Sequence, residues 1–233
     1  MPAPVDIAPG LAEDILQAMK DSLSGNSELK GLTNKLARGT ATLEDAHRVS
    51  QITGNAASEA LKAVLNPAIL PDGRLYYNIG SRTVTPAIEY ANNVTSEYTR
   101  TVQNTLYKKN GINIKTVSPS LDTESINNLV GMMDNAQNFA DATWMLDNPV
   151  KEHVSHFVDR FVKVNSKVAE EAGLHPMLIR TAEPNCCEWC ANLEGEYNYW
   201  EVNKGDDVWR RHNGCECYLE FVPTVGPSKS VWG

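Results

Sequence analysis

Apolar side chains recur three and four residues apart over most of this 233-residue chain, which is the spacing of one face of an α-helix. Proline, glycine and asparagine interrupt the pattern at intervals, as they do at helix ends. Thr42 is a candidate N-cap, with Asp45 three residues later. The pattern predicts helices over about 11–24, 27–38, 43–65, 86–110, 123–146 and 149–172.

The helix expected at 149–172 has the most regular apolar positions. They alternate steps of four and three residues, as in a coiled coil, at Val150, Val154, Phe157, Phe161, Val164 and Val168. This seam fits packing against another helix of the same chain, and the alternative is a helix-mediated oligomer with a second subunit. Asp159 and Lys163 are spaced for an ion pair on the outer face of this helix.

Short stretches typical of strands appear near the C-terminus, where 177–181, 195–199 and 218–222 are predicted strands. Segment 112–119 is either another strand or an extended link. Gly205 and Asp206 suit the turn of a small hairpin. The predicted fold class is therefore mainly α, with a helical body followed by a small C-terminal α+β zinc-binding module that contains short antiparallel strands.

The positions of proline, glycine and asparagine that interrupt the helical pattern also predict the domain organisation. A helical domain is expected over 1–173, with two sub-bundles at 1–66 and 86–173 as an alternative. The cysteine- and histidine-containing module is expected over 174–222. Residues 223–233 are rich in Gly, Pro and Ser and are expected to form a flexible tail.

Composition narrows the functional classes. A net charge of -8 argues against a protein that coats nucleic acid. A mean hydropathy of -0.36 and the lack of a long apolar run argue against a membrane span. The first ten residues lack the basic and apolar regions of a secretory signal, so folding in a reducing cytoplasm is expected. Clustered cysteines in that compartment more often bind metal or carry out redox chemistry than form disulfides.

All five cysteines lie between positions 186 and 217, in the pattern CxxC followed by HxxCxC. A tetrahedral zinc site needs four thiolate or imidazole ligands, and a CxxC turn supplies two of them. The favoured ligands are Cys187, Cys190, His212 and Cys215, with Cys217 as the alternative ligand and Cys186 as the bystander. A structural zinc staple is the expected role, because aromatic residues around the ion would give the module a small core that could not stand alone.

The same stretch is also compatible with other chemistry. A catalytic metal would keep an open position and a nearby general base. The candidate general bases in this stretch are Glu188, Glu194 and Glu216, but none has a recognisable catalytic spacing. A redox dithiol, buried free cysteines, or a disulfide formed after release from the cell are the remaining alternatives. His212 within RHNG also has a weak likeness to short histidine nuclease motifs.

The run IRTAEPNCCEWCANLEGEYNY, followed by VWRRHNGCECYLEFVP, resembles the C-terminal end of the Mu F-like minor head proteins of tailed bacteriophages. These are also called phage head morphogenesis or minor capsid proteins, and the resemblance is to forms from phages of Gram-positive bacteria. The residues that carry it are Cys187, Cys190, Leu193, Gly195, His212, Cys215 and Cys217. Glu216 stands where members often carry a basic residue, which weakens any DNA contact by this loop.

The resemblance implies a non-enzymatic structural protein present in few copies. It would associate with the portal and with capsid or scaffold proteins during head assembly, with at most a weak DNA contact and no membrane contact. Its expected location is the virion, in the capsid interior or portal region, and the host cytoplasm during assembly. The alternatives are a zinc-dependent nuclease or toxin-like effector using His212, and a host-encoded zinc-binding adaptor.

Overall fold

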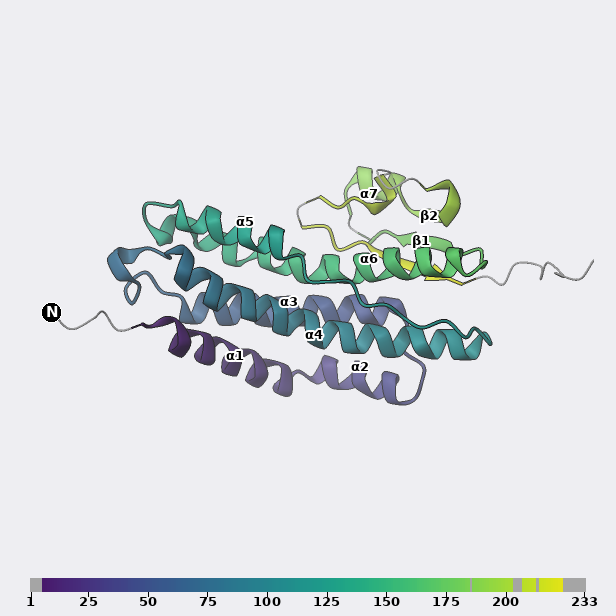
Figure 1. The fold of residues 1–233 in the computed structure, drawn as a ribbon, viewed down its shortest axis with the longest axis horizontal. Coiled ribbons are helices and arrows are strands. Elements are labelled where there is room, and N and C mark those ends of the chain that lie inside the picture. Colours follow the sequence, from purple (N-terminus) through teal and green to yellow (C-terminus); the bar gives the residue numbers. More distant parts are fainter. Residues whose placement is uncertain (1–5, 185, 203–206, 213, 224–233) are drawn as a thin grey trace, which may run out of the picture.

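The computed structural model describes residues 6–184, 186–202, 207–212 and 214–223 (Figure 1). It shows a mainly helical body followed by a small three-stranded antiparallel sheet, which confirms the predicted fold class. The body contains α1 (Ala8–Gly25), α2 (Ser27–Ala37), α3 (Leu43–Val64), α4 (Tyr77–Lys109), α5 (Thr123–Asp134) and α6 (Asn148–Glu171). The C-terminal part contains β1 (Met177–Thr181), the short helix α7 (Glu188–Asn192), β2 (Gly195–Asn198) and β3 (Tyr218–Val222).

Helix α3 lies at the centre of the body and packs against α1, α4 and α6. Its start is fixed by the predicted capping box. The Asp45 backbone N–H donates to Thr42 Oγ1 at 3.2 Å, and the Thr42 N–H donates to Asp45 Oδ2 at 3.0 Å. The helices of both predicted sub-bundles therefore share one body, because α3 from the first is in contact with α4 and α6 from the second.

Gly54 allows α3 and α6 to approach closely. A Cβ at this position would lie 3.3 Å from both the Cα and the carbonyl oxygen of Lys151. Next to it, the Thr53 and Thr95 hydroxyls are 3.0 Å apart and link α3 to α4. The small residue is thus required by backbone-to-backbone packing rather than by an unusual backbone angle.

Two predicted helices have different bounds in the structure. Helix α4 begins at Tyr77, so Pro86 lies inside it rather than in its first turn. Burial of Ile79 and Val84 in the added turns outweighs the cost of about 3 kcal/mol that an interior proline carries. The helix expected at 123–146 ends at Asp134. A 3₁₀ helix (Phe139–Leu146) follows, and the Asn138 side chain caps its start by accepting from the Ala140 N–H.

The structure also decides two local features that the sequence pattern left uncertain. Trp144, which lies within the helix predicted at 123–146, is 59% exposed in the 3₁₀ segment. Segment 112–119 contains no strand and is the extended link of the two alternatives. In both places the local sequence suits more than one conformation, and contacts with the rest of the body decide between them.

The apolar seam of α6 is covered by its own chain. Val150, Val154, Phe157 and Phe161 are buried, while Val164 and Val168 are half-buried. Helix α6 packs against α3 and α4 on one side and against β3 on the other. The intramolecular interpretation is therefore confirmed for these four side chains, and the seam is not a free surface for a second subunit.

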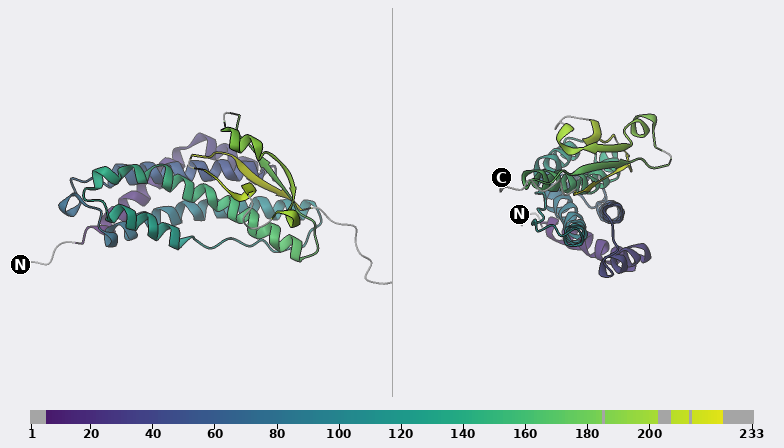
Figure 2. Two further views of the ribbon diagram at one scale, coloured as in Figure 1. Left: turned by 90° about the horizontal axis from the view of Figure 1, so that it is seen from above. Right: turned by 90° about the vertical axis from the view of Figure 1, so that its right-hand side faces the viewer.

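The sheet has the order β2-β1-β3 with antiparallel pairing throughout. It lies on the outer side of α6, on the side of the body away from α1 (Figures 1 and 2). Leu178, Leu219 and Phe221 join the same apolar cluster as Val158 and Val162 of α6. The sheet thus shares its core with the helical body.

The predicted turn at Gly205 and Asp206 lies outside the described residues, as does the tail from 224 to 233. Among the helices that the structure describes, none has the combination of length and apolar character needed to cross a bilayer.

Gly54→Val should lower the free energy of unfolding by about 1–3 kcal/mol, because the added side chain would overlap the α6 backbone. Urea unfolding followed by circular dichroism measures this. Gly31→Val in α2 is the matched control, since a Cβ there meets nothing within 4 Å, and it should change stability by less than about 0.5 kcal/mol. Equal effects at both positions would contradict the close-packing argument.

Candidate metal centre

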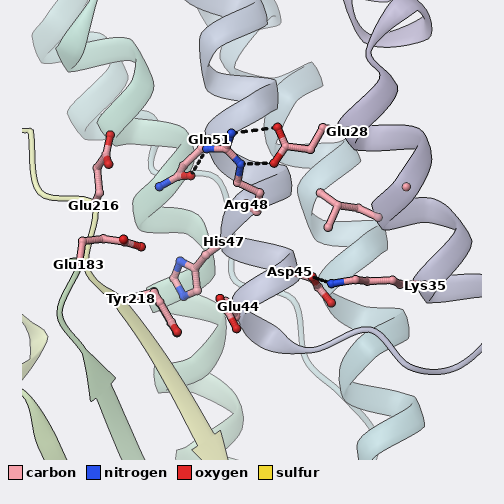
Figure 3. A pocket seen from close by; sticks show the side chains of 12 residues that line it. Glu28, Lys35, Glu44, Asp45, His47, Arg48, Gln51, Glu183, Glu216 and Tyr218 are labelled. Carbon is pink, nitrogen blue, oxygen red and sulfur yellow. Dashed lines mark hydrogen bonds and ion pairs between the residues drawn. The ribbon is translucent and has the colours of Figure 1, made fainter.

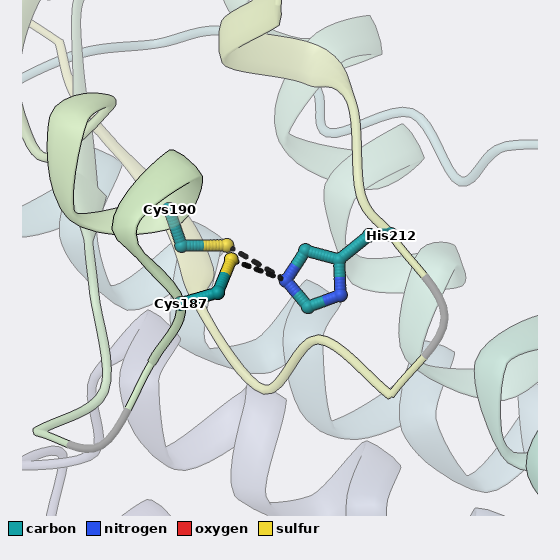
Figure 4. Close-up of side chains that lie close together, drawn as sticks. All are labelled: Cys187, Cys190 and His212. Carbon is teal, nitrogen blue, oxygen red and sulfur yellow. Dashed lines mark hydrogen bonds between the residues drawn. The ribbon is translucent and has the colours of Figure 1, made fainter.

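Two separate segments supply the cysteine and histidine side chains. Cys187 is the N-terminal boundary residue of α7, and Cys190 lies within this one-turn helix. His212, Cys215 and Cys217 come from the segment that leads into β3. Figure 4 shows the His212 ring directed at both thiols of the CxxC pair.

The distances are short enough for a shared ion. His212 Nε2 lies 3.2 Å from Cys187 Sγ and 3.1 Å from Cys190 Sγ. Cys190 Sγ lies 3.5 Å from Cys215 Sγ. Ligand atoms around a tetrahedral zinc ion are roughly 3.5–3.8 Å apart, given its usual bond lengths, so each of these three contacts is within about half an ångström of the coordinated spacing.

The predicted ligands fall into two overlapping groups that share Cys190. One group is Cys187, Cys190 and His212, and the other is Cys190, Cys215 and Cys217. Within each group the ligand atoms all lie within 4.8 Å of one another. The donor set of soft thiols and one imidazole suits zinc, so this cluster could hold a metal such as zinc. Cys186, the predicted bystander, lines the same cavity of about 220 Å³.

The thiols are in an environment that a cation would complement. Burial raises the pKa of Cys190, and hydrogen bonding with Cys215 and Cys217 raises it further. Burial also raises the pKa of Cys215. The Cys187 thiol, in contrast, has a lowered pKa, chiefly because the Cys190 backbone N–H donates to it. Zinc ligation would supply the positive charge that stabilises all of these groups as thiolates.

Arg180 holds the two halves of the cluster together from β1, and sequence reasoning missed it. Its buried guanidinium donates from Nη1 to the carbonyl oxygens of Val208 at 2.6 Å and Arg210 at 2.9 Å. Nη2 lies 4.0 Å from Cys190 Sγ, and the group stacks over Trp189 at 5.5 Å. The period-two alternation of β1, which puts Arg180 on the same buried face as Leu178, was the available signal.

The segment that carries His212 is anchored to α6. Arg211 forms a two-pronged ion pair with Asp159, with Nη2 2.7 Å from Oδ1 and Nε bonded to Oδ2. Arg211 Nη1 also donates to the Cys215 carbonyl oxygen at 3.2 Å, and the Gly214 N–H donates to Glu152 Oε1 at 2.6 Å. Burial alone would raise the pKa of Asp159, but Arg211 outweighs it and the net shift is downward.

This arrangement corrects the predicted outer-face pair of Asp159 with Lys163. Asp159 is buried and faces Arg211, whereas Lys163 lies 4.8 Å above the Trp209 ring. Spacing along one helix could not show that the sheet segment would cover this part of α6.

Helix α3 contacts the same region through His47. His47 Nε2 lies 2.9 Å from the carbonyl oxygen and 3.3 Å from the backbone N of Leu219, so the imidazole occupies the open edge of β3. It is also 3.8 Å from Asp159 Oδ1. Burial lowers the pKa of His47 to about 4, so the ring is neutral at pH 7.

A cavity of about 520 Å³ adjoins the cluster, between α2, α3 and the segments that flank the cysteines (Figure 3). Glu183 and Glu216 line both this cavity and the one at the cysteines. The basic Arg48 in its wall pairs with Glu28, with Nη2 2.9 Å from Oε2. The rim of the cysteine cluster is therefore acidic on this side, which disfavours contact with a phosphate backbone.

Comparison of the chain with protein-family models, curated proteins and solved structures finds no match. The class that fold and site define is a helical protein with a cysteine- and histidine-rich, metal-competent C-terminal module.

Asp159→Asn should lower the free energy of unfolding by about 3–5 kcal/mol, because it leaves the Arg211 charge buried without its partner. Urea unfolding at pH 7 measures the loss. Glu171→Gln, which breaks an exposed 3.5 Å pair with Lys167, is the control and should cost less than about 0.5 kcal/mol. Similar losses for both variants would show that the buried pair does not anchor the segment.

Lowering the pH should reveal how much the neutral His47 side chain contributes to the free energy of unfolding. Its pKa is about 4 in the folded protein against 6.5 for a solvent-exposed histidine, so the unfolded chain binds the extra proton first as pH falls. Stability due to this group is complete above pH 7 and declines by about 2 kcal/mol between pH 7 and 5. The free energies of unfolding of the wild type and of His47→Gln are compared at each pH, which isolates the contribution of His47. A difference between the two proteins that stays constant from pH 7 to 5 would refute the lowered pKa of His47.

Proposed function

We propose that this protein is a structural minor capsid or head morphogenesis protein of a tailed phage, with a zinc staple at its C-terminus. The observation that carries the staple is the position of His212, whose Nε2 lies within 3.2 Å of both thiols of the CxxC pair. The phage assignment is supported by the CxxC and HxxCxC pattern and its resemblance to Mu F-like minor head proteins.

We assign the zinc ligands as Cys187, Cys190, His212 and Cys215. Short contacts connect these four side chains in series, from Cys187 to His212, from His212 to Cys190, and from Cys190 to Cys215. Cys215 and Cys217 both belong to the second group with Cys190, and Cys217 stays the alternative ligand because no contact as short as these three is found for it in the described part of the chain. Bound zinc would supply a crosslink between α7 and the segment before β3.

The proposed role of the staple is to hold the sheet in its docked position on α3 and α6. Arg211, next to the ligand His212, reaches Asp159 on α6, so coordination and docking involve adjacent residues. The outward surfaces of the helical body then serve as the contact area for portal, capsid or scaffold proteins. The protein would work in the host cytoplasm during assembly and in the capsid interior or portal region of the virion.

The alternative, a zinc-dependent nuclease or toxin-like effector, requires His212 as an acid or base. In the structure the Nε2 of this residue is turned toward two thiols, where it suits coordination better than proton transfer to a substrate. Glu183 and Glu216 also make the rim acidic, which supports neither a nuclease nor the weak DNA contact.

Metal content tests the staple. Protein purified under reducing conditions should carry about one zinc per chain, and Cys187→Ser or His212→Ala should lose most of it because three ligands bind far more weakly than four. Glu188→Gln, an exposed neighbour of Cys187, is the matched control and should keep its zinc. Unchanged zinc and thermal stability in both ligand variants would overturn the staple.

Co-purification with the portal protein tests the assembly role. Tagged protein expressed during phage infection should recover the portal protein from the lysate, and Asp159→Asn should recover less because the sheet is no longer held on α6. A complete lysate in which the tagged protein recovers no portal, capsid or scaffold protein would contradict this role. A nuclease activity abolished by His212→Ala would favour the alternative.

A further inference from the structure

Arg180 is a buried cation whose charge the protein groups around it do not balance. The residue is only 2% exposed. A guanidinium stays protonated in proteins, and burial of a charge costs free energy unless an opposite charge compensates it. Within the part of the chain that the structure describes, Arg180 has no carboxylate partner, and its buried Nε has no hydrogen-bond partner at all.

Arg211 in the same module shows how such a charge is usually compensated. Its side chain is 6% exposed, and its guanidinium is paired with the Asp159 carboxylate, with Nη2 2.7 Å from Oδ1. Arg180 donates instead to neutral carbonyl oxygens, those of Val208 at 2.6 Å and Arg210 at 2.9 Å. Carbonyl oxygens carry only partial charges, so a full negative charge for Arg180 has to come from another group.

The Cys190 sulfur is the group in position to supply this charge. It lies 4.0 Å from Arg180 Nη2, and Cys190 is completely buried. Cys190 is also the residue that the two groups of potential ligands share. A cysteine bound to zinc is a thiolate, and its attraction to a nearby cation is strong in a buried site, where water does not screen it.

The proposed ligand set has the charge that matches Arg180. A zinc ion has two positive charges, the thiolates of Cys187, Cys190 and Cys215 have three negative charges, and the neutral imidazole of His212 adds none. The centre therefore has one net negative charge, and the guanidinium has one positive charge. Together they form a neutral group, which is less costly to bury than either charge alone.

We infer that Arg180 is a positioning residue of the metal centre, and that its guanidinium is the counter-ion of the negatively charged zinc–thiolate group, acting through Cys190. This inference rests on the proposed zinc staple and adds the feature that retains its metal. Arg180 is paired with Gly195 of β2 on one side and with Leu219 of β3 on the other, so the sheet fixes its place. Partners of this kind typically strengthen metal binding about 10–100-fold.

The first test measures zinc affinity of the full chain by competition with a chromogenic chelator under reducing conditions. Arg180→Gln should weaken zinc binding about 10–100-fold. Arg210→Gln is the matched control, because it removes the same charge close to His212 but from a side chain that is 70% exposed. Its effect should be below about threefold, since solvent screens an exposed charge. Equal effects of the two substitutions would overturn the inference.

A change in the charge of the centre separates a counter-ion from an arginine that only supports the fold. Cys215→His would give two thiolates and two imidazoles, so the zinc centre would have no net charge. In that background Arg180→Gln should weaken zinc binding by less than about threefold, because no negative charge remains to be balanced. The visible absorption of cobalt, bound in place of zinc, checks that each variant keeps a four-coordinate site. The same loss of affinity in both backgrounds would contradict the counter-ion role.

Arg180→Lys decides the matter if Arg180→Gln does not fold or Cys215→His binds no metal. Lysine keeps the charge but loses the planar fork that holds the carbonyl oxygens of Val208 and Arg210. A counter-ion role predicts a zinc affinity within about threefold of the wild type, with lower stability of the metal-free chain. A loss of about tenfold or more would overturn the inference. A wild-type chain that binds no zinc would refute the staple as well, whereas wild-type zinc affinity in Arg180→Gln would refute only the role of Arg180.

Discussion

The buried ion pair between Arg211 and Asp159 is the contact on which the C-terminal half of the structure depends. It joins the segment that carries His212 to the middle of α6. Both charges lose their hydration there, so each is stable only while the other is in place. The pair therefore fixes where the sheet lies on the helical body, and that position in turn brings the cysteine-bearing segments together.

Two further contacts make this docking specific. His47 reaches across from α3 and occupies the open edge of β3 at Leu219. Arg180 reaches from β1 to the carbonyl oxygens of Val208 and Arg210, just before His212. Hydrogen bonds to buried polar and charged groups are directional, so they select one arrangement, while apolar side chains such as Phe221 supply buried area. The cluster is thus held by contacts from both the sheet and the helices.

The sequence by itself determined the local features of this protein. Helical periodicity, the Thr42 capping box and the three short strands follow from spacing and from nearby residues, and so does the grouping of CxxC with HxxCxC. The tertiary structure alone decided that Asp159 faces Arg211 and that α4 continues through Pro86. Those outcomes depend on segments far apart in the chain, whose mutual burial outweighs local propensity and cannot be inferred from spacing.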